Sequence, residues 1–155
     1  MRTIEAKPAA AGLRVAVVVS KYNDFVTDRL QAGAIAALST LGVSSANVTV
    51  IKVPGAFEIS LAAQQAAATK AFDAVVCLGC LIRGATAHFE YIASAVSHGI
   101  TAASTATGVP ITFGVLTTNS VEEAIERAGD GPANKGWEAA AAAVELASVI
   151  AQLHQ

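Results

Sequence analysis

Short apolar runs alternate along the chain with segments in which apolar residues recur at helical spacing. The runs are rich in β-branched residues and predict strands at 14–20, 48–53, 72–81 and 111–116. Apolar residues at steps of three to five predict helices at 24–41, 56–69, 86–107 and 135–153, with a shorter helix capped by Asn119 or Ser120. The apolar runs are continuous rather than alternating, which is typical of strands covered on both faces.

Strands that alternate with helices favour right-handed βαβ crossovers and a parallel sheet. We therefore expect a three-layer α/β/α fold: a flavodoxin-like, four-stranded parallel sheet with helices on both faces. Nothing divides the chain, so residues 1–155 should form a single domain, with residues 1–12 as an N-terminal arm. Residues 3–7 (TIEAK) could add an edge strand.

The composition is unusually apolar, with 54% hydrophobic and 14% charged residues. Average soluble domains are about 25% charged. The excess could indicate a membrane protein or a soluble protein that buries surface against copies of itself. Glycine, proline and hydroxyl residues interrupt the longest uncharged run, 91–121, and no signal-peptide pattern opens the chain. We therefore favour a cytoplasmic homo-oligomer with no membrane contact.

Charge and cysteine content exclude several other classes. The net charge is −2 and no basic patch appears, which argues against nucleic acid as a partner. Cys77 and Cys80 lie in an apolar run, and residues three apart on a strand face opposite sides, so we expect buried hydrophobes rather than a redox pair. The histidines and cysteines have no metal-ligand spacing, and no nucleotide-binding glycine motif is present. We expect neither metal nor cofactor.

Ligands of open parallel sheets bind at the carboxyl ends of the strands. The segments there are 20–24, 53–58, 81–90 and 116–119. Each has a purely structural explanation: Asn23 and Asp24 could cap a helix, and Glu58 could oppose a helix dipole. Together they bring an aromatic ring, a carboxylate and an imidazole to one edge of the sheet, as a binding pocket requires.

The turn at 83–86 (RGAT) leads from a predicted strand into a predicted helix. Backbone N–H groups and the helix dipole favour an anion such as phosphate at such a turn. His88 follows closely and could carry protons for a bound substrate, or could merely cap or pack locally. Arg127 and Lys135 could recognise phosphate as a planar fork and a point charge, although alone each would pass as a surface charge.

With these residues identified, the chain resembles the lumazine synthase family. The resemblance rests on PGAFE at 54–58, RGATAHFE at 83–90 and NKG at 134–136, with weaker matches from 14 to 147. It implies a transferase of riboflavin biosynthesis that needs no cofactor and condenses 5-amino-6-(D-ribitylamino)uracil with 3,4-dihydroxy-2-butanone 4-phosphate. The product would be 6,7-dimethyl-8-ribityllumazine, with phosphate and water released. Two alternatives stay open: an archaeal-type riboflavin synthase, and a non-catalytic shell protein that binds flavin or lumazine.

The resemblance also implies roles for single residues on the pyrimidine side. Tyr22 would stack on the ring, at a position that is usually Phe or Trp in the family. Asn23 and Glu58 would meet the ribityl chain or the polar edge of the ring. Phe113 would cap the pocket, and Lys135 would contact the pyrimidine edge or the phosphate side. Backbone groups that would hold the ring belong to Ala56, Phe57, Leu81 and Ile82.

On the phosphate side, the N–H groups of Ala85 and Thr86 would bind the anion together with Arg127. His88 would move protons as the catalytic residue. In the family, Phe113 and Arg127 reach in from a neighbouring subunit, so the resemblance implies a homopentamer, which in some members closes into an icosahedral shell of about 60 copies. It also suggests riboflavin synthase as a further partner.

Overall fold

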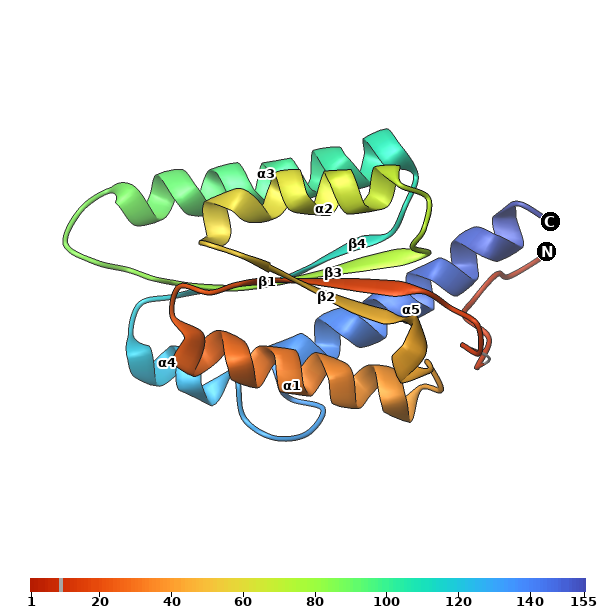
Figure 1. Cartoon of the computed structure of the whole chain (residues 1–155), viewed down its shortest axis with the longest axis horizontal. Coiled ribbons are helices and arrows are strands. Elements are labelled where there is room, and N and C mark those ends of the chain that lie inside the picture. Colours follow the sequence, from red (N-terminus) through yellow and green to blue (C-terminus); the bar gives the residue numbers. More distant parts are fainter. Residues whose placement is uncertain (9) are drawn as a thin grey trace.

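The computed structural model describes residues 1–8 and 10–155. Its centre is a parallel sheet of β1 (Val15–Ser20), β2 (Val48–Val53), β3 (Ala74–Ile82) and β4 (Ile111–Thr118). The strand order is β2-β1-β3-β4 (Figure 1), so β2 and β4 are the edges. This arrangement confirms the predicted four-stranded, flavodoxin-like sheet.

Helices cover both faces of the sheet (Figure 1). One layer holds α1 (Asp24–Thr40), α4 (Val121–Glu126) and α5 (Lys135–Leu153), and the other holds α2 (Ile59–Ala68) and α3 (His88–Thr107). Two short 3₁₀ turns, η1 (Ser45–Asn47) and η2 (Ala56–Glu58), complete the elements. The three-layer architecture expected from the alternation of strands and helices is therefore confirmed.

The core consists of two apolar clusters, one on each side of the sheet. Along β1, Val15, Val17 and Val19 belong to the cluster under α1 and α5, whereas Ala16 and Val18 belong to the cluster under α2 and α3. All of them are fully buried. Because successive strand residues face opposite sides, a central strand covered twice must be apolar at every position, which explains the continuous run.

The two cysteines lie in opposite clusters, Cys77 under α3 and Cys80 under α1 and α5. Burial raises the pKa of the Cys77 thiol to about 12 and that of Cys80 to about 11. A thiol must ionise to react, so neither is suited to redox chemistry. The interpretation of both as small buried hydrophobes is confirmed.

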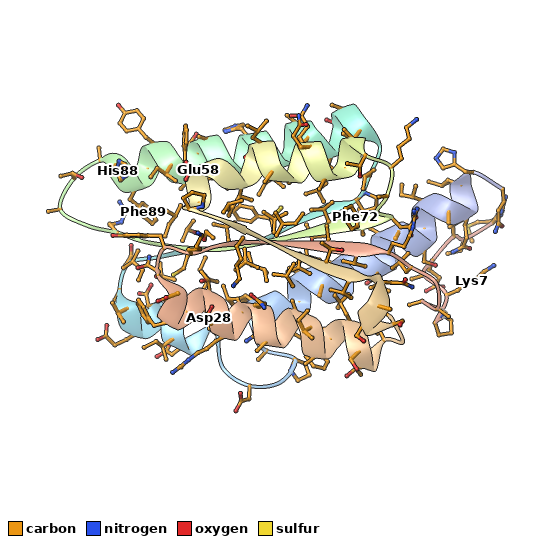
Figure 2. All side chains as sticks on the ribbon, in the orientation of Figure 1. Lys7, Asp28, Glu58, Phe72, His88 and Phe89 are labelled. Carbon is orange, nitrogen blue, oxygen red and sulfur yellow. The ribbon has the colours of Figure 1, made fainter. Side chains whose placement is uncertain are left out.

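The N-terminal segment does not form the edge strand considered for residues 3–7. Instead it follows the end of α5, where Lys7 N donates to Ser148 Oγ at 2.9 Å and Gln152 Nε2 donates to the carbonyl oxygen of Glu5 at 2.8 Å. Figure 2 shows Lys7 beside this end of α5. Side chains of α5 thus bind backbone groups that a neighbouring strand would otherwise have paired.

Most predicted boundaries agree with the structure within two residues, and 48–53 and 135–153 agree at both ends. The helix predicted at 86–107 begins at His88, and the one predicted at 56–69 opens with the 3₁₀ turn η2. Among the residues with described positions, no helix has both the length and the apolar character needed to cross a membrane.

Close packing of α5 against α1 requires Gly136. A Cβ built there would overlap the carbonyl oxygen of Leu30, which is backbone and cannot move aside easily. We expect Gly136→Ala to lower the free energy of unfolding by about 1–3 kcal/mol, although alanine favours helix more than glycine. The control is Gly129→Ala, where the new Cβ would lie 3.8 Å from the carbonyl oxygen of Glu126. Equal urea midpoints for the two variants would contradict this close approach.

Candidate active site

A cleft of about 760 Å³ opens at the carboxyl ends of the strands, where the segments after β1, β2 and β3 meet the start of α3. Figure 2 shows Glu58, His88 and Phe89 at this end of the molecule. The cleft lies where open parallel sheets bind ligands. Its lining comprises Tyr22, Asn23, Pro54, Gly55, Ala56, Phe57, Glu58, Cys80, Leu81, Ile82, Gly84, Thr86, His88, Phe89, Tyr91 and Ile92.

Asn23 ties together the two segments on either side of the point where strand order reverses. The chain leaves β1 toward β2 and later returns to pair β3 with the other side of β1. Asn23 has a left-handed backbone (φ 62°), which asparagine tolerates, and its Nδ2 donates to the carbonyl oxygen of Cys80 at 2.9 Å. It makes no side-chain cap for α1, so the capping explanation of Asn23 is wrong.

Three aromatic side chains at the cleft are largely exposed: Tyr22 (72%), Phe57 (62%) and Tyr91 (77%). Exposed apolar surface grouped around a concavity is typical of a binding site rather than of a folding core. Tyr22 and Phe57 were predicted from the sequence and Tyr91 was not. Its spacing of three from His88 on one helix face is the signal that could have identified it.

The carboxylate of Glu58 has a structural role as well as a place in the cleft. Its Oε1 accepts a hydrogen bond from Gly55 N at 3.0 Å, which closes the turn at the start of η2. The explanation of Glu58 as a local helix-start partner is therefore correct in part. The same contact fixes the position of the carboxylate at the cleft.

The β3–α3 connection forms an exposed loop before His88, the first residue of α3. The backbone amide of Thr86 therefore precedes the helix, so the prediction that the helix begins at Thr86 is wrong by two residues. The amide of Ala85 lies before the helix, as predicted. Thr86 and Gly84 line the cleft, whereas Ala85 lies in the same turn outside the lining. The exposed imidazole of His88 stands where the loop meets the helix.

Phe113, Arg127 and Lys135 lie in a second hollow of about 450 Å³ along β4 and α5. The Nη1 of Arg127 donates to the carbonyl oxygen of Glu123 at 2.9 Å, and the Nζ of Lys135 lies 2.9 Å from Glu138 Oε2. Neither cation lines the first cleft, and no other Lys or Arg does so among the residues that the structure describes. One chain thus brings most of the candidate residues to the cleft but leaves Phe113, Arg127 and Lys135 in a separate hollow.

Asn134 holds the segment that carries both cations, and sequence reasoning identified it only as part of a motif. Its side chain is 3% exposed. Its Oδ1 accepts from Gly136 N and Trp137 N at 2.7 and 3.1 Å, and its Nδ2 donates to the carbonyl oxygens of Gly129 and Arg29 at 2.8 and 3.2 Å. Burial of this side chain depends on α1, so helical spacing around position 134 could not reveal it.

Asn134→Ala should destabilise the fold more than the loss of an ordinary helix cap. We expect about 2–4 kcal/mol, since the variant loses an N-cap and leaves two carbonyl groups without their donor. Ser120→Ala is the matched control, because Ser120 Oγ only caps α4 through Glu123 N. That variant should lose about 1 kcal/mol in the same urea titration. Similar losses would show that the bonds to Gly129 and Arg29 contribute nothing.

Comparison with known proteins agrees with this geometry. Residues 12–151 match the family model described as 6,7-dimethyl-8-ribityllumazine synthase. A protein named 6,7-dimethyl-8-ribityllumazine synthase from Syntrophus aciditrophicus (strain SB) is 49% identical over 149 residues, which cover 96% of this chain and 97% of that protein. The match spans every segment that builds the cleft and the second hollow, and the chain belongs to the 6,7-dimethyl-8-ribityllumazine synthase family.

Proposed function

We propose that this chain catalyses the lumazine synthase step of riboflavin biosynthesis. It condenses 5-amino-6-(D-ribitylamino)uracil with 3,4-dihydroxy-2-butanone 4-phosphate to give 6,7-dimethyl-8-ribityllumazine. The observation that carries the proposal is the cleft, where aromatic rings, a carboxylate, an imidazole and the exposed turn before α3 converge in a member of this family. Membership favours this reaction over the riboflavin synthase and storage-shell alternatives.

The pyrimidine fits the aromatic side of the cleft. In our proposal Tyr22 stacks on the ring, and backbone groups of 56–57 and 81–82 hold its carbonyl and N–H groups. Asn23 and Glu58 then face the ribityl chain or the polar ring edge. Both are already held by protein hydrogen bonds, so little order is lost when they meet a ligand.

The phosphate of the second substrate fits the loop before α3, and the chemistry then falls beside His88. Gly84 and Thr86 line the cleft at the point where backbone N–H groups can donate hydrogen bonds to an anion. The 5-amino group forms an imine with the ketone and releases water, phosphate is eliminated, and the ring closes with loss of a second water. His88 moves protons in these steps. Positioning two substrates accounts for much of the rate, since orientation is worth about 7–11 kcal/mol.

A complete site requires a second copy of the chain. The cleft has no lining cation of its own among the described residues, while Arg127, Lys135 and the 46%-exposed Phe113 face a separate hollow on edge strand β4. We infer that a neighbouring subunit lends these residues, so that each site lies at a subunit interface. The assembly we propose is a homopentamer, which can close into an icosahedral shell. A cytoplasmic location and an association with riboflavin synthase stay predictions.

His88→Ala should slow turnover by on the order of 10²-fold or less, because the positioning groups survive and only proton transfer suffers. Lumazine absorbance with both substrates measures this rate. His98→Ala is the control, since His98 lies on the same helix outside the cleft and bonds Ser94. A wild-type rate in His88→Ala would remove His88 from the mechanism. Riboflavin formed from lumazine alone would favour the archaeal-type synthase instead.

Arg127→Ala should raise the KM for the sugar phosphate far more than the KM for the pyrimidine, because the guanidinium would bind the anion. Equal changes in both values would contradict this role.

Refolding Arg127→Ala together with His88→Ala tests whether the two residues of one site come from different subunits. Random mixing leaves about one interface in four with both native residues, so activity should exceed that of either variant alone. No recovery would mean that both residues serve the same chain's site.

A further inference from the structure

Arg83 directly precedes the turn proposed for phosphate, and its side chain is tied down although it is 46% exposed. Its Nε donates to Asn119 Oδ1 at 3.0 Å, and its Nη1 pairs with the carboxylate of Glu90. The guanidinium carbon lies 4.5 Å from the centroid of the Phe89 ring. Three different side chains therefore hold one guanidinium group.

These contacts join the start of the β3–α3 loop to the residues that follow the loop. Glu90 and Phe89 belong to the first turn of α3, and Asn119 follows β4 directly. The backbone adds a further tie, since Arg83 N donates to the carbonyl oxygen of Thr118 at 2.8 Å. Arg83, at the start of the loop, is thus connected with helix α3 at the end of the loop and with the end of strand β4.

The loop between these anchors has little internal support. Within residues 1–8 and 10–155, the backbone N–H groups of Gly84, Ala85 and Thr86 donate no hydrogen bond to another protein group. A Cβ at Gly84 would meet nothing within 4 Å. The geometry of the turn is consequently set by its two ends, and the guanidinium joins those ends.

The guanidinium is not placed to bind the anion itself. Arg83 lines a neighbouring hollow with Asn119 and Phe113 and does not line the cleft. Its charge is neutralised by Glu90. Phe89 lines both hollows and stands between them, so the side chain of Arg83 lies behind the wall of the cleft.

We propose that Arg83 is a positioning residue that preorganises the turn at 84–86 for the phosphate of the substrate. The proposal rests on the proposed function, in which this turn binds phosphate. A rigid turn spares the ligand the cost of ordering it, which raises affinity without any direct contact. We call the contacts of Arg83 with Asn119, Glu90 and Phe89 the clamp. Lysine cannot replace it, because only a planar guanidinium group can donate to two acceptors and lie over an aromatic ring at the same time.

The test compares Arg83→Met, Arg83→Lys, Glu90→Gln and the double variant Arg83→Met/Glu90→Gln as full-length assemblies. Calorimetry gives the Kd of inorganic phosphate, and steady-state kinetics give the KM for each substrate. We expect Arg83→Met and Arg83→Lys to weaken phosphate and raise the KM for the sugar phosphate by roughly tenfold. The KM for the pyrimidine should change less than about twofold.

Glu90→Gln separates positioning from direct binding by its sign. If Arg83 positions the turn, loss of its ion pair weakens phosphate binding. If Arg83 binds phosphate directly, removal of the competing carboxylate strengthens it, and that result would overturn the proposal. The double variant should be no worse than Arg83→Met, because both substitutions break one clamp.

Arg14→Met is the matched control. Arg14 is 47% exposed and pairs with Asp73 at 3.1 Å, but it precedes β1 at the opposite end of the sheet. Its removal should leave phosphate binding unchanged. Light scattering checks that each variant keeps the particle mass of the wild type. If Arg83→Met does not assemble, the phosphate Kd of Glu90→Gln tests the proposal.

The outcomes distinguish this inference from the proposed function. An unchanged phosphate Kd in the Arg83 variants, or a wild-type protein that binds no phosphate, would overturn the inference. Lumazine formation by the wild type tests the function separately. The expected Kd pattern without any turnover would support the clamp while contradicting the reaction.

Discussion

The constraint on which the structure depends is that its central strands are buried on both faces. β1 and β3 bury every residue from Val15 to Val19 and from Ala74 to Cys80, so helices must cover the sheet above and below. Polar chemistry is then excluded from the sheet itself. It can occur only where the strands end, and order reversal between β1 and β3 opens room there for a ligand.

The segments at that edge are held by hydrogen bonds between the candidate residues and their own backbone. Asn23 Nδ2 donates to the carbonyl oxygen of Cys80 in β3, and Gly55 N donates to the carboxylate of Glu58. A structural role and a binding role are therefore compatible in one side chain. The same contact that stabilises the local fold reduces the freedom that binding would have to remove.

The positively charged side chains lie away from the cleft. The cleft supplies aromatic surface and the turn proposed to bind phosphate, while Arg127 and Lys135 line a separate hollow along β4 and α5. The nearest arginine in sequence, Arg83, is already paired with Glu90. A cation for an anion at this turn would have to come from elsewhere on the surface, which supports the proposed site shared between copies of the chain.

Local sequence patterns were enough to predict the elements, the sheet type and the sheet edge that holds the candidate site, because apolar periodicity and turn residues act on their immediate neighbours. Short motifs also predicted Tyr22, Glu58 and His88 at the cleft, but not Tyr91. Three features became apparent only in the folded chain: Phe113, Arg127 and Lys135 face another hollow, Asn134 is buried against α1, and residues 3–7 follow α5. These outcomes depend on strand order and on contacts between residues far apart in the chain, which local periodicity does not encode.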